Sequence, residues 1–164
     1  MDRSAVTKIL PLEIIAERLA ALRATGKTIV LCHGCFDLMH IGHIKHLQAA
    51  KRMGDTLVVT VTADQYVANV EGRPVFGEFL RAEALAALQC VDFVAIDHRP
   101  TAVEAIRLVR PHYYVKGQVC AVASQRSANL RSEIEALHDV GGETRFTDEV
   151  VFSSTALLNT HLRA

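Results

Sequence analysis

The chain has 164 residues, of which 50% are hydrophobic and 22% are charged, enough for one core but too few for two full domains. Eighteen Lys and Arg residues balance eighteen Asp and Glu residues. This balance excludes a broad basic surface for nucleic acid or an anionic membrane. The apolar runs are far shorter than the roughly 18 residues of a membrane-spanning helix, and the N-terminus is charged where a signal peptide is apolar. We therefore expect a soluble cytoplasmic protein.

Predicted helices and strands alternate along the chain. Leu12, Ile15, Leu19 and Leu22 have helical spacing and predict a first helix, which Gly26 ends. Apolar, β-branched runs at 28–32 and 56–61 predict strands that are buried on both faces. The remaining expected strands are 93–96, 112–115 and 143–146, and the remaining expected helices are 41–53, 78–88, 101–110 with Thr101 as its cap, 130–140, and a last one after Ser153.

This alternation predicts a doubly wound α/β fold, in which helices cover both faces of a parallel sheet. No linker, repeat or low-complexity segment divides the sequence. We therefore expect a single domain over 1–164, with a helical extension at 1–26 and a core at 27–164. Ligands of such a fold bind at the carboxyl ends of the strands.

The strongest motif lies where the first strand passes into the next helix, and it reads Gly34-Cys-Phe-Asp-Leu-Met-His-Ile-Gly-His43. A helix N-terminus binds phosphate because its backbone N–H groups are free and its dipole is positive there. His40 and His43 can both face such an anion, since Gly42 between them has no side chain to block it. The alternative is that the histidines have no function in binding, with one packed in the core and the other on the surface. Their position between a strand and a helix favours a phosphate site instead.

The same run, with His40-Ile-Gly-His43, resembles the signature of the cytidylyltransferase-like nucleotidyltransferases. Further matches follow in the family's order over about residues 28–160. They are Gly54-Asp55, Val61-Thr-Ala-Asp64, Gly72-Arg-Pro-Val75, Arg81, Val91-Asp92, Val115-Lys-Gly117, Gly141-Gly142 and Phe152-Ser-Ser-Thr155. The chain is most similar to the domains that act on heptose 1-phosphate, and glycerol-3-phosphate cytidylyltransferase is a more distant relative. The resemblance implies a Rossmann-like enzyme that joins a nucleoside monophosphate from ATP or CTP to a phosphorylated small molecule.

The resemblance also implies residue roles. His40 and His43 would contact the triphosphate and stabilise the transition state, while Arg81 and Lys116 would be further catalytic residues that bring positive charge. The nucleotide-binding residues would be Gly34, Cys35, Phe36, Asp37, Gly42, Ser153, Ser154 and Thr155, with Asp37 as the orienting residue. Asp64 and Asp92 would contact the acceptor, although a cap or turn is an equally good role for each. His33 could touch the nucleotide from the strand end, and His46 is expected along the side of its helix.

The implied reaction requires neither nucleic acid nor a membrane. Its partners would be a nucleoside triphosphate and a sugar phosphate, D-glycero-β-D-manno-heptose 1-phosphate, with ADP-heptose and pyrophosphate as products. The alternative acceptor is glycerol 3-phosphate or another small alcohol phosphate, with CTP as donor. Mg²⁺ would enter with the triphosphate and be bound mostly by its phosphates, so no separate metal site is expected. The resemblance further implies a homodimer and a sugar kinase in the same pathway.

Three positions depart from the family pattern. The loop at 67–71 has no lysine where relatives often carry one, and Gln118-Val119-Cys120 follows Lys116-Gly117 where heptose-type relatives place a polar residue, Asp and Tyr. Asp148-Glu149 stands where some relatives have an arginine. The residues expected to bind the triphosphate are retained despite these changes. The changes instead concern the identity of the second substrate. A degenerate regulatory subunit is the corresponding alternative, and the retained histidines, arginine and lysine argue against it.

Two other protein classes share parts of the motif. Class I aminoacyl-tRNA synthetases also carry His-Ile-Gly-His, but this chain has neither their second, lysine-rich signature nor a basic surface for tRNA. Cys32, Cys35, His40 and His43 could bind zinc, and Cys32-x-x-Cys35 could support redox chemistry. Core-type residues fill the space between these ligands, however, and the predicted helix begins several residues later. We expect reduced thiols that pack in the core.

Overall fold

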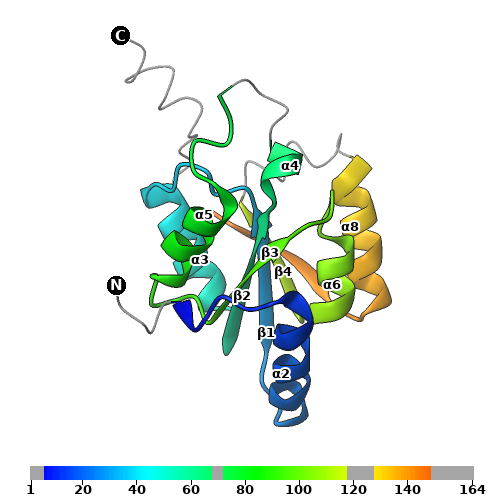
Figure 1. Ribbon diagram of the computed structural model, residues 1–164. Coiled ribbons are helices and arrows are strands. Elements are labelled where there is room, and N and C mark those ends of the chain that lie inside the picture. The colour runs from blue at the N-terminus through cyan, green and yellow to red at the C-terminus, as the bar shows by residue number, and fades with distance from the viewer. Residues whose placement is uncertain (1–5, 68–71, 118–127, 149–164) are drawn as a thin grey trace.

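The structure, a computed structural model, describes residues 6–67, 72–117 and 128–148. Five strands form one parallel sheet in the order β3-β2-β1-β4-β5 (Figure 1). The order reverses between β1 and β4, so this pair is the topological switch point at which such sheets bind ligands. The strands are β1 (Ile29–Gly34), β2 (Thr56–Thr62), β3 (Phe93–Asp97), β4 (Tyr113–Gly117) and β5 (Glu143–Thr147).

Helices cover both faces of the sheet (Figure 1). One face packs against α3 (Ile41–Lys51) and α5 (Glu78–Ala86), and the short α4 (Asp64–Val67) follows β2. The other face packs against α2 (Leu12–Ala24), α6 (Val103–Val109) and α8 (Ala128–Asp139). This arrangement confirms the predicted doubly wound α/β fold. Among the described residues, no helix combines the length and the apolar character needed to cross a membrane.

Two apolar clusters, one on each face, hold the layers together, and β1 contributes to both. Ile29 and Leu31 pack under α2, α6 and α8, whereas Val30 and Cys32 pack under α3 and α5. Successive side chains of a strand point to opposite faces, so a strand that is covered on both sides must be apolar throughout. Each such buried aliphatic side chain stabilises the fold by about 2 kcal/mol.

Most predicted elements are present, with ends that coincide or shift by one or two residues. The apolar stripe of α2 packs on its own sheet, where Ile15 and Leu19 are fully buried. Thr101 does not cap α6 as predicted, because that helix starts after Ala102, whose N–H is bound by a carboxylate from α8. The four residues of α4 are too few to show a period and were not predicted. The predicted helix after Ser153 lies outside the described residues.

Candidate functional site

The candidate site lies at the carboxyl ends of the strands around the switch point. β1 ends at Gly34 and leads through residues 35–40 into α3, and β4 ends with Lys116 and Gly117. Asp64 directly follows Ala63 after β2, at the same edge of the sheet. The structure thus brings the whole motif from Gly34 to His43 to one end of the sheet, together with Asp64 and Lys116.

His40 and His43 cap the first turn of α3 together. The Gly42 N–H donates to His40 Nδ1 over 3.1 Å, and the His40 N–H donates to His43 Nδ1 over 3.4 Å. This reciprocal pair has the form of a capping box. The two rings stack with their centroids 4.0 Å apart. Because each Nδ1 accepts, the neutral rings carry their protons on Nε2, where they are hydrogen-bond donors.

Both rings of this pair are neutral at neutral pH. Burial, followed by the neighbouring His40 and His46, lowers the pKa of His43 to about 4. Burial also lowers the pKa of His40 below its ordinary value of 6.5. The pair therefore offers N–H donors rather than formal charges at the positive end of the α3 dipole. Such donors suit an oxyanion, whose arrival would also favour protonation of the rings.

The Phe36 ring also packs against His43. The two rings meet edge to face with centroids 5.5 Å apart. Phe36 adopts φ 53°, in the left-handed region that a bulky residue occupies only under local constraint. A Cβ at Gly34 would lie 3.1 Å from Phe36 Cε2, so the absence of a side chain at Gly34 leaves room for this ring. Gly34 thus acts on the histidine pair through Phe36.

Asp37 ties the loop before α5 to the motif. Its buried carboxylate accepts hydrogen bonds from Arg73 Nη1 at 2.6 Å, from the Val75 N–H at 2.8 Å and from the Phe76 N–H at 3.0 Å. Burial alone raises the pKa of Asp37, but these hydrogen bonds and the Arg73 charge outweigh it, so the pKa lies below its usual value. Asp37 is therefore an ionised orienting residue that fixes the loop beside the histidines.

Arg81 lies beneath the motif, and its side chain is fully buried. It donates to the carbonyl of Cys35, to the carbonyls of Thr62 at 2.8 Å and Phe76 at 2.9 Å, and to Asp64 Oδ1 at 2.7 Å. The guanidinium thus joins the motif to β2, α4 and the start of α5. This geometry gives Arg81 a positioning role, and its direct contact with phosphate stays a prediction.

Lys116 brings positive charge to the switch point. β1 and β4 pair with Leu31 beside Tyr114, so His33 and Lys116, each two residues further along, point to the same face. Lys116 Nζ lies 3.4 Å from Glu133 Oε2 on α8 and 4.7 Å from the centroid of the Tyr114 ring. Burial first and the Lys116 charge second lower the pKa of His33 to about 4. The charge of Lys116 on β4 therefore acts on His33 on β1, across the switch point.

His46 has a role that its sequence position did not reveal. Its Nδ1 lies 2.7 Å from Thr147 Oγ1, so it links α3 to the carboxyl end of β5 rather than lying along the side of its helix. Burial and then the Lys116 charge lower its pKa to about 4. His33 is held in a similar way, with Nδ1 at 2.9 Å from Thr60 Oγ1. Both are neutral side chains that bind hydroxyl groups within the protein.

Asp92 is not brought to the site. It precedes β3 at the amino end of the sheet, where its Oδ2 accepts from Lys51 Nζ at 2.6 Å and from the Leu57 N–H at 2.7 Å. These contacts fit the structural alternative that the sequence left open for this residue. Three further predicted nucleotide-binding residues lie outside the described residues, namely Ser153, Ser154 and Thr155.

Cys32 and Cys35, the two cysteines of the motif, do not have the properties of metal or redox ligands. Burial raises the pKa of the Cys32 thiol to about 12, and burial also raises the pKa of Cys35. Reactive and metal-bound thiols need the opposite shift. In the parts of the chain that the structure describes, no three His, Cys, Asp or Glu side chains gather as a metal site.

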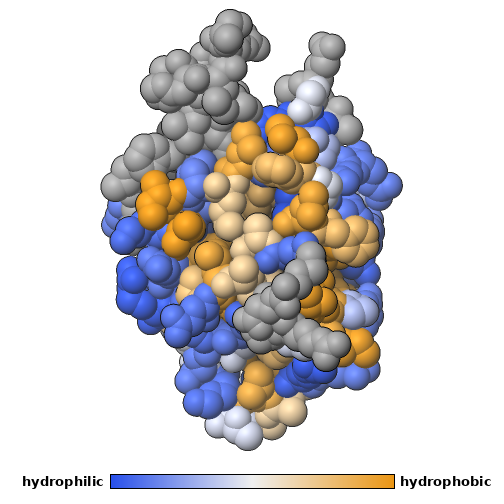
Figure 2. All heavy atoms as spheres, turned by 60° about the vertical axis from the view of Figure 1, so that its left-hand side comes forward, coloured by the Kyte–Doolittle hydropathy of each residue, from blue (hydrophilic) through white to orange (hydrophobic). Residues whose placement is uncertain are grey.

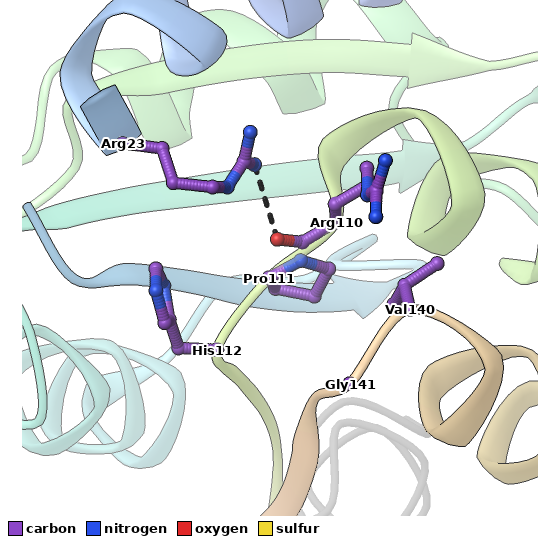
Figure 3. Close-up of a pocket in the computed structure, with 6 residues that line it drawn as sticks. All are labelled: Arg23, Arg110, Pro111, His112, Val140 and Gly141. Carbon is purple, nitrogen blue, oxygen red and sulfur yellow. Dashed lines mark hydrogen bonds between the residues drawn. The ribbon is translucent and has the colours of Figure 1, made fainter.

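A separate hollow of about 360 Å³ lies at the amino end of the sheet (Figure 3). Arg23 points across it and donates to the carbonyls of Val109 at 2.6 Å and Arg110 at 3.1 Å, where α6 ends. A cation at a helix C-terminus satisfies free carbonyls and interacts favourably with the dipole. The hollow is thus explained by helix capping. Its lining residues are Arg23, Arg110, Pro111, His112, Val140 and Gly141.

Comparison with known proteins identifies the family. A family model described as cytidylyltransferase-like matches residues 31–159, which include the histidine pair, Arg81 and Lys116. The chain belongs to the cytidylyltransferase-like family. This match confirms the resemblance found in the motif and makes the chain a nucleotidyltransferase by family.

Curated relatives of this cytidylyltransferase-like chain include several bifunctional proteins HldE. The protein from Trichlorobacter lovleyi is 41% identical over 117 residues, which are 70% of this chain and 24% of that protein. The Geotalea uraniireducens protein is 45% identical over 112 residues, 67% of this chain and 23% of that protein. The Nitratiruptor sp. protein is 37% identical over 145 residues, 87% of this chain and 29% of that protein. The chain thus spans about a quarter of the length of these relatives.

A solved structure has the same cytidylyltransferase-like architecture. The crystal structure of the lipopolysaccharide core biosynthesis protein from Thermoplasma volcanium GSS1 matches with a TM-score of 0.60 at 25% sequence identity. The match covers 78% of this chain and 100% of that chain. It supports a Rossmann-like nucleotidyltransferase fold, in agreement with the five-stranded parallel sheet.

Proposed function

We propose that this chain transfers a nucleoside monophosphate from ATP to D-glycero-β-D-manno-heptose 1-phosphate, giving ADP-heptose and pyrophosphate. The observation that carries the proposal is the reciprocal cap of His40 and His43, which places two Nε2–H donors at a helix N-terminus beside the switch point. The family assignment and the HldE relatives support nucleotidyl transfer. The sugar phosphate follows from the heptose-type resemblance of the motifs.

In the proposed reaction an oxygen of the acceptor phosphate attacks the α-phosphorus of the nucleotide, and pyrophosphate leaves. No covalent nucleophile is needed, because alignment and stabilisation of developing charge account for catalysis of this kind. His40 and His43 would donate hydrogen bonds from Nε2 to the triphosphate oxygens as their negative charge increases. Lys116 would add a formal positive charge from the β4 side.

The surrounding residues would hold these groups in place. Asp37 fixes the loop at 73–76 against the motif, and Arg81 joins the motif to Asp64. The side chain of Asp64 is 42% exposed at the end of β2, so its carboxylate can meet the acceptor while Arg81 sets its orientation. We assign the acceptor contact to Asp64 and not to Asp92, which faces the opposite end of the sheet.

The proposed reaction implies further partners. Mg²⁺ would arrive with the triphosphate and remain bound mostly to phosphate oxygens and water. A sugar kinase would supply the 1-phosphate acceptor. The proposed homodimer has a suitable surface, because Figure 2 shows hydrophobic side chains on the face that carries α3 and α5. The large exposed side chains there include Val75, Phe76, Phe79 and Leu80, which are 46–67% exposed.

Pyrophosphate release tests the proposed function. The purified protein is assayed with Mg²⁺ while ATP and CTP are crossed against heptose 1-phosphate, glycerol 3-phosphate and phosphocholine. We expect release only from ATP with heptose 1-phosphate. Release from CTP with glycerol 3-phosphate would replace this assignment by the cytidylyltransferase alternative, and no release from any pair by folded protein would contradict transfer to these acceptors.

A further inference from the structure

Glu133 is a buried carboxylate in the middle of α8. It is 5% exposed and shares the apolar stripe of the helix with Leu130 and Leu137, at positions i+3, i and i+7. Its Oε1 accepts from the Ala102 N–H at 3.2 Å, and its Oε2 accepts from the Tyr114 hydroxyl at 2.9 Å. A buried charge destabilises a fold unless partners compensate it. A glutamine amide has only one oxygen, so it could accept from only one of these two donors in the same geometry.

Lys116 is the cation that compensates this buried charge. Its Nζ lies 3.4 Å from Glu133 Oε2, and the two side chains are only 13% and 7% exposed. The same Nζ lies 4.7 Å from the centroid of the Tyr114 ring, within range of a cation–π contact. Carboxylate and ring thus hold the ammonium from two sides. Glu133 links this lysine on β4 to α8 and to the start of α6.

The length of the ion pair leaves the lysine able to bind another anion. Hydrogen bonds between an ammonium and a carboxylate are usually 2.7–2.9 Å long. Lys51 and Asp92, at the other end of the sheet, form such a closed pair at 2.6 Å. Glu133 instead gives its shorter contact to Tyr114, and Lys116 lies further away at 3.4 Å. Glu133 therefore orients Lys116 by charge without taking up its donors in a close hydrogen bond.

We propose that Glu133 is a positioning residue, which holds the Lys116 ammonium at the carboxyl end of β4 so that it meets the phosphate groups of the nucleotide. This inference rests on the proposed function, in which Lys116 contacts phosphate. Glu133 itself touches Ala102, Tyr114 and Lys116 and would not touch the substrate. Loss of its charge should therefore weaken nucleotide binding through Lys116 alone.

Kinetics of variants test this dependence. Glu133→Gln keeps the size of the side chain and an acceptor for Ala102 but removes the charge, and Glu135→Gln on the exposed face of α8 is the matched control. We expect Glu133→Gln to raise KM for the nucleotide about tenfold, the scale of losing one charge-assisted contact, with a smaller change in kcat. In a Lys116→Met background the same change should have no further effect on KM. Equal losses in both backgrounds, or none in either, would overturn the proposal.

Acylation of lysines gives a second measurement that does not depend on activity. The folded protein is treated with acetic anhydride, and the modification rate of Lys116 is compared by mass spectrometry with that of the exposed Lys45. Glu133→Gln should speed the reaction of Lys116 several-fold, because the ammonium is no longer held. Tyr114→Phe should slow the acylation of Lys116. Glu133 Oε2 then loses the hydrogen bond from Tyr114 and can form a shorter hydrogen bond with Lys116. Lys45 should not change in either variant.

These opposite shifts separate positioning from general support of the fold. If Glu133→Gln does not fold, the Tyr114→Phe result still decides the proposal, and an unchanged or faster reaction of Lys116 in that variant would overturn it. If the wild-type protein releases no pyrophosphate from any substrate pair, the proposed function fails, while the acylation rates still show whether Glu133 holds Lys116.

Discussion

The amino and carboxyl ends of the sheet carry their polar side chains in different states. At the amino end, oppositely charged groups meet at short range, with Lys51 Nζ 2.6 Å from Asp92 and Lys27 Nζ 3.0 Å from Asp55. At the carboxyl end, the histidines of the α3 cap are neutral, and the Lys116 ammonium stays 3.4 Å from Glu133. The carboxyl end also holds two close pairs, Arg73 with Asp37 and Arg81 with Asp64, which fix the segments around the site. Close pairs satisfy each other, whereas the neutral donors and the loosely paired Lys116 can still bind a ligand.

This difference shows how one sheet separates stability from function. Partly exposed ion pairs such as Lys51 with Asp92 contribute at most about 1 kcal/mol each. The buried imidazoles at the carboxyl end resist protonation, and the left-handed Phe36 is a local strain. The strain lowers stability at any pH, whereas the imidazoles lower it only as the pH falls below about 6.5. Both features prepare this end of the sheet for an anion. The substitutions below test whether the two ends are separable in this way.

Arg81 should give the largest effect, because it is the side chain on which the order of the carboxyl end depends. Arg81→Met leaves three carbonyls and the Asp64 carboxylate without their donor. We expect the free energy of unfolding in urea to fall by about 3 kcal/mol. Arg107→Met, in an exposed pair with Glu104, is the control and should change it by less than about 0.5 kcal/mol. Similar values for the two variants would contradict the positioning role of Arg81.

His43 should give the next largest effect, on turnover rather than on stability. His43→Ala removes one of the two Nε2–H donors and should lower kcat for pyrophosphate release at least about a hundredfold. Its unfolding free energy should fall by only about 1 kcal/mol, the cost of one lost cap. His43→Gln is the matched variant, because glutamine at this position retains the capping acceptor. Full turnover in His43→Ala would remove the histidine pair from the mechanism.

Much of the fold and part of the site follow from local sequence patterns. The helical period of Leu12, Ile15 and Leu19 predicts α2, and the apolar run at 28–32 predicts β1. The position of His40-Ile-Gly-His43 between a strand and a helix predicts that both histidines lie at a helix N-terminus. The sequence already held the information that places Asp92, because this residue precedes the strand predicted at 93–96 and the residue before a strand of a parallel sheet lies at the amino end. Asp92 precedes β3 and therefore faces away from the site.

Other site features depend on contacts between distant segments. Glu133 stands on the apolar stripe of α8, which is a visible signal of a buried acid, but its partner Lys116 is identified only by the packing of α8 on β4. His46 and Thr147 are 101 residues apart and meet only because β5 lies beside β4 at the sheet edge. Arg81 is the opposite case. The family resemblance predicted it as a site residue, but only the structure shows which groups it contacts.

A pH titration should weaken the carboxyl end selectively. The pKa of His46 is about 4 in the folded protein and 6.5 ordinarily, so between these values the unfolded chain binds more protons. Its contribution to stability is thus complete above about pH 6.5 and is lost as the pH falls towards 4. His46→Asn should reduce the slope of unfolding free energy against pH by up to about 1.4 kcal/mol per unit. Urea denaturation between about pH 4.5 and 6.5 measures this slope.

His138→Asn is the control for this titration, because that histidine is exposed on α8 and has no place in the site. Its slope should match that of the wild-type protein. If His46→Asn also keeps the wild-type slope, His46 titrates normally in the folded protein and the carboxyl end is not selectively sensitive to acid.

Lys51 should give the smallest effect and completes the comparison with Lys116. Lys51→Met breaks the 2.6 Å pair at the amino end, but Asp92 keeps its hydrogen bond from the Leu57 N–H. The unfolding free energy should fall by about 0.5–1 kcal/mol, with kcat and KM unchanged. Lys116→Met is the same substitution at the other end and should raise KM for the nucleotide. Because it leaves the buried Glu133 carboxylate without its cation, it should also lower the free energy of unfolding by more than Lys51→Met does. A loss of activity in Lys51→Met would mean that charge at the amino end reaches the site, and the two ends would then act as one electrostatic unit.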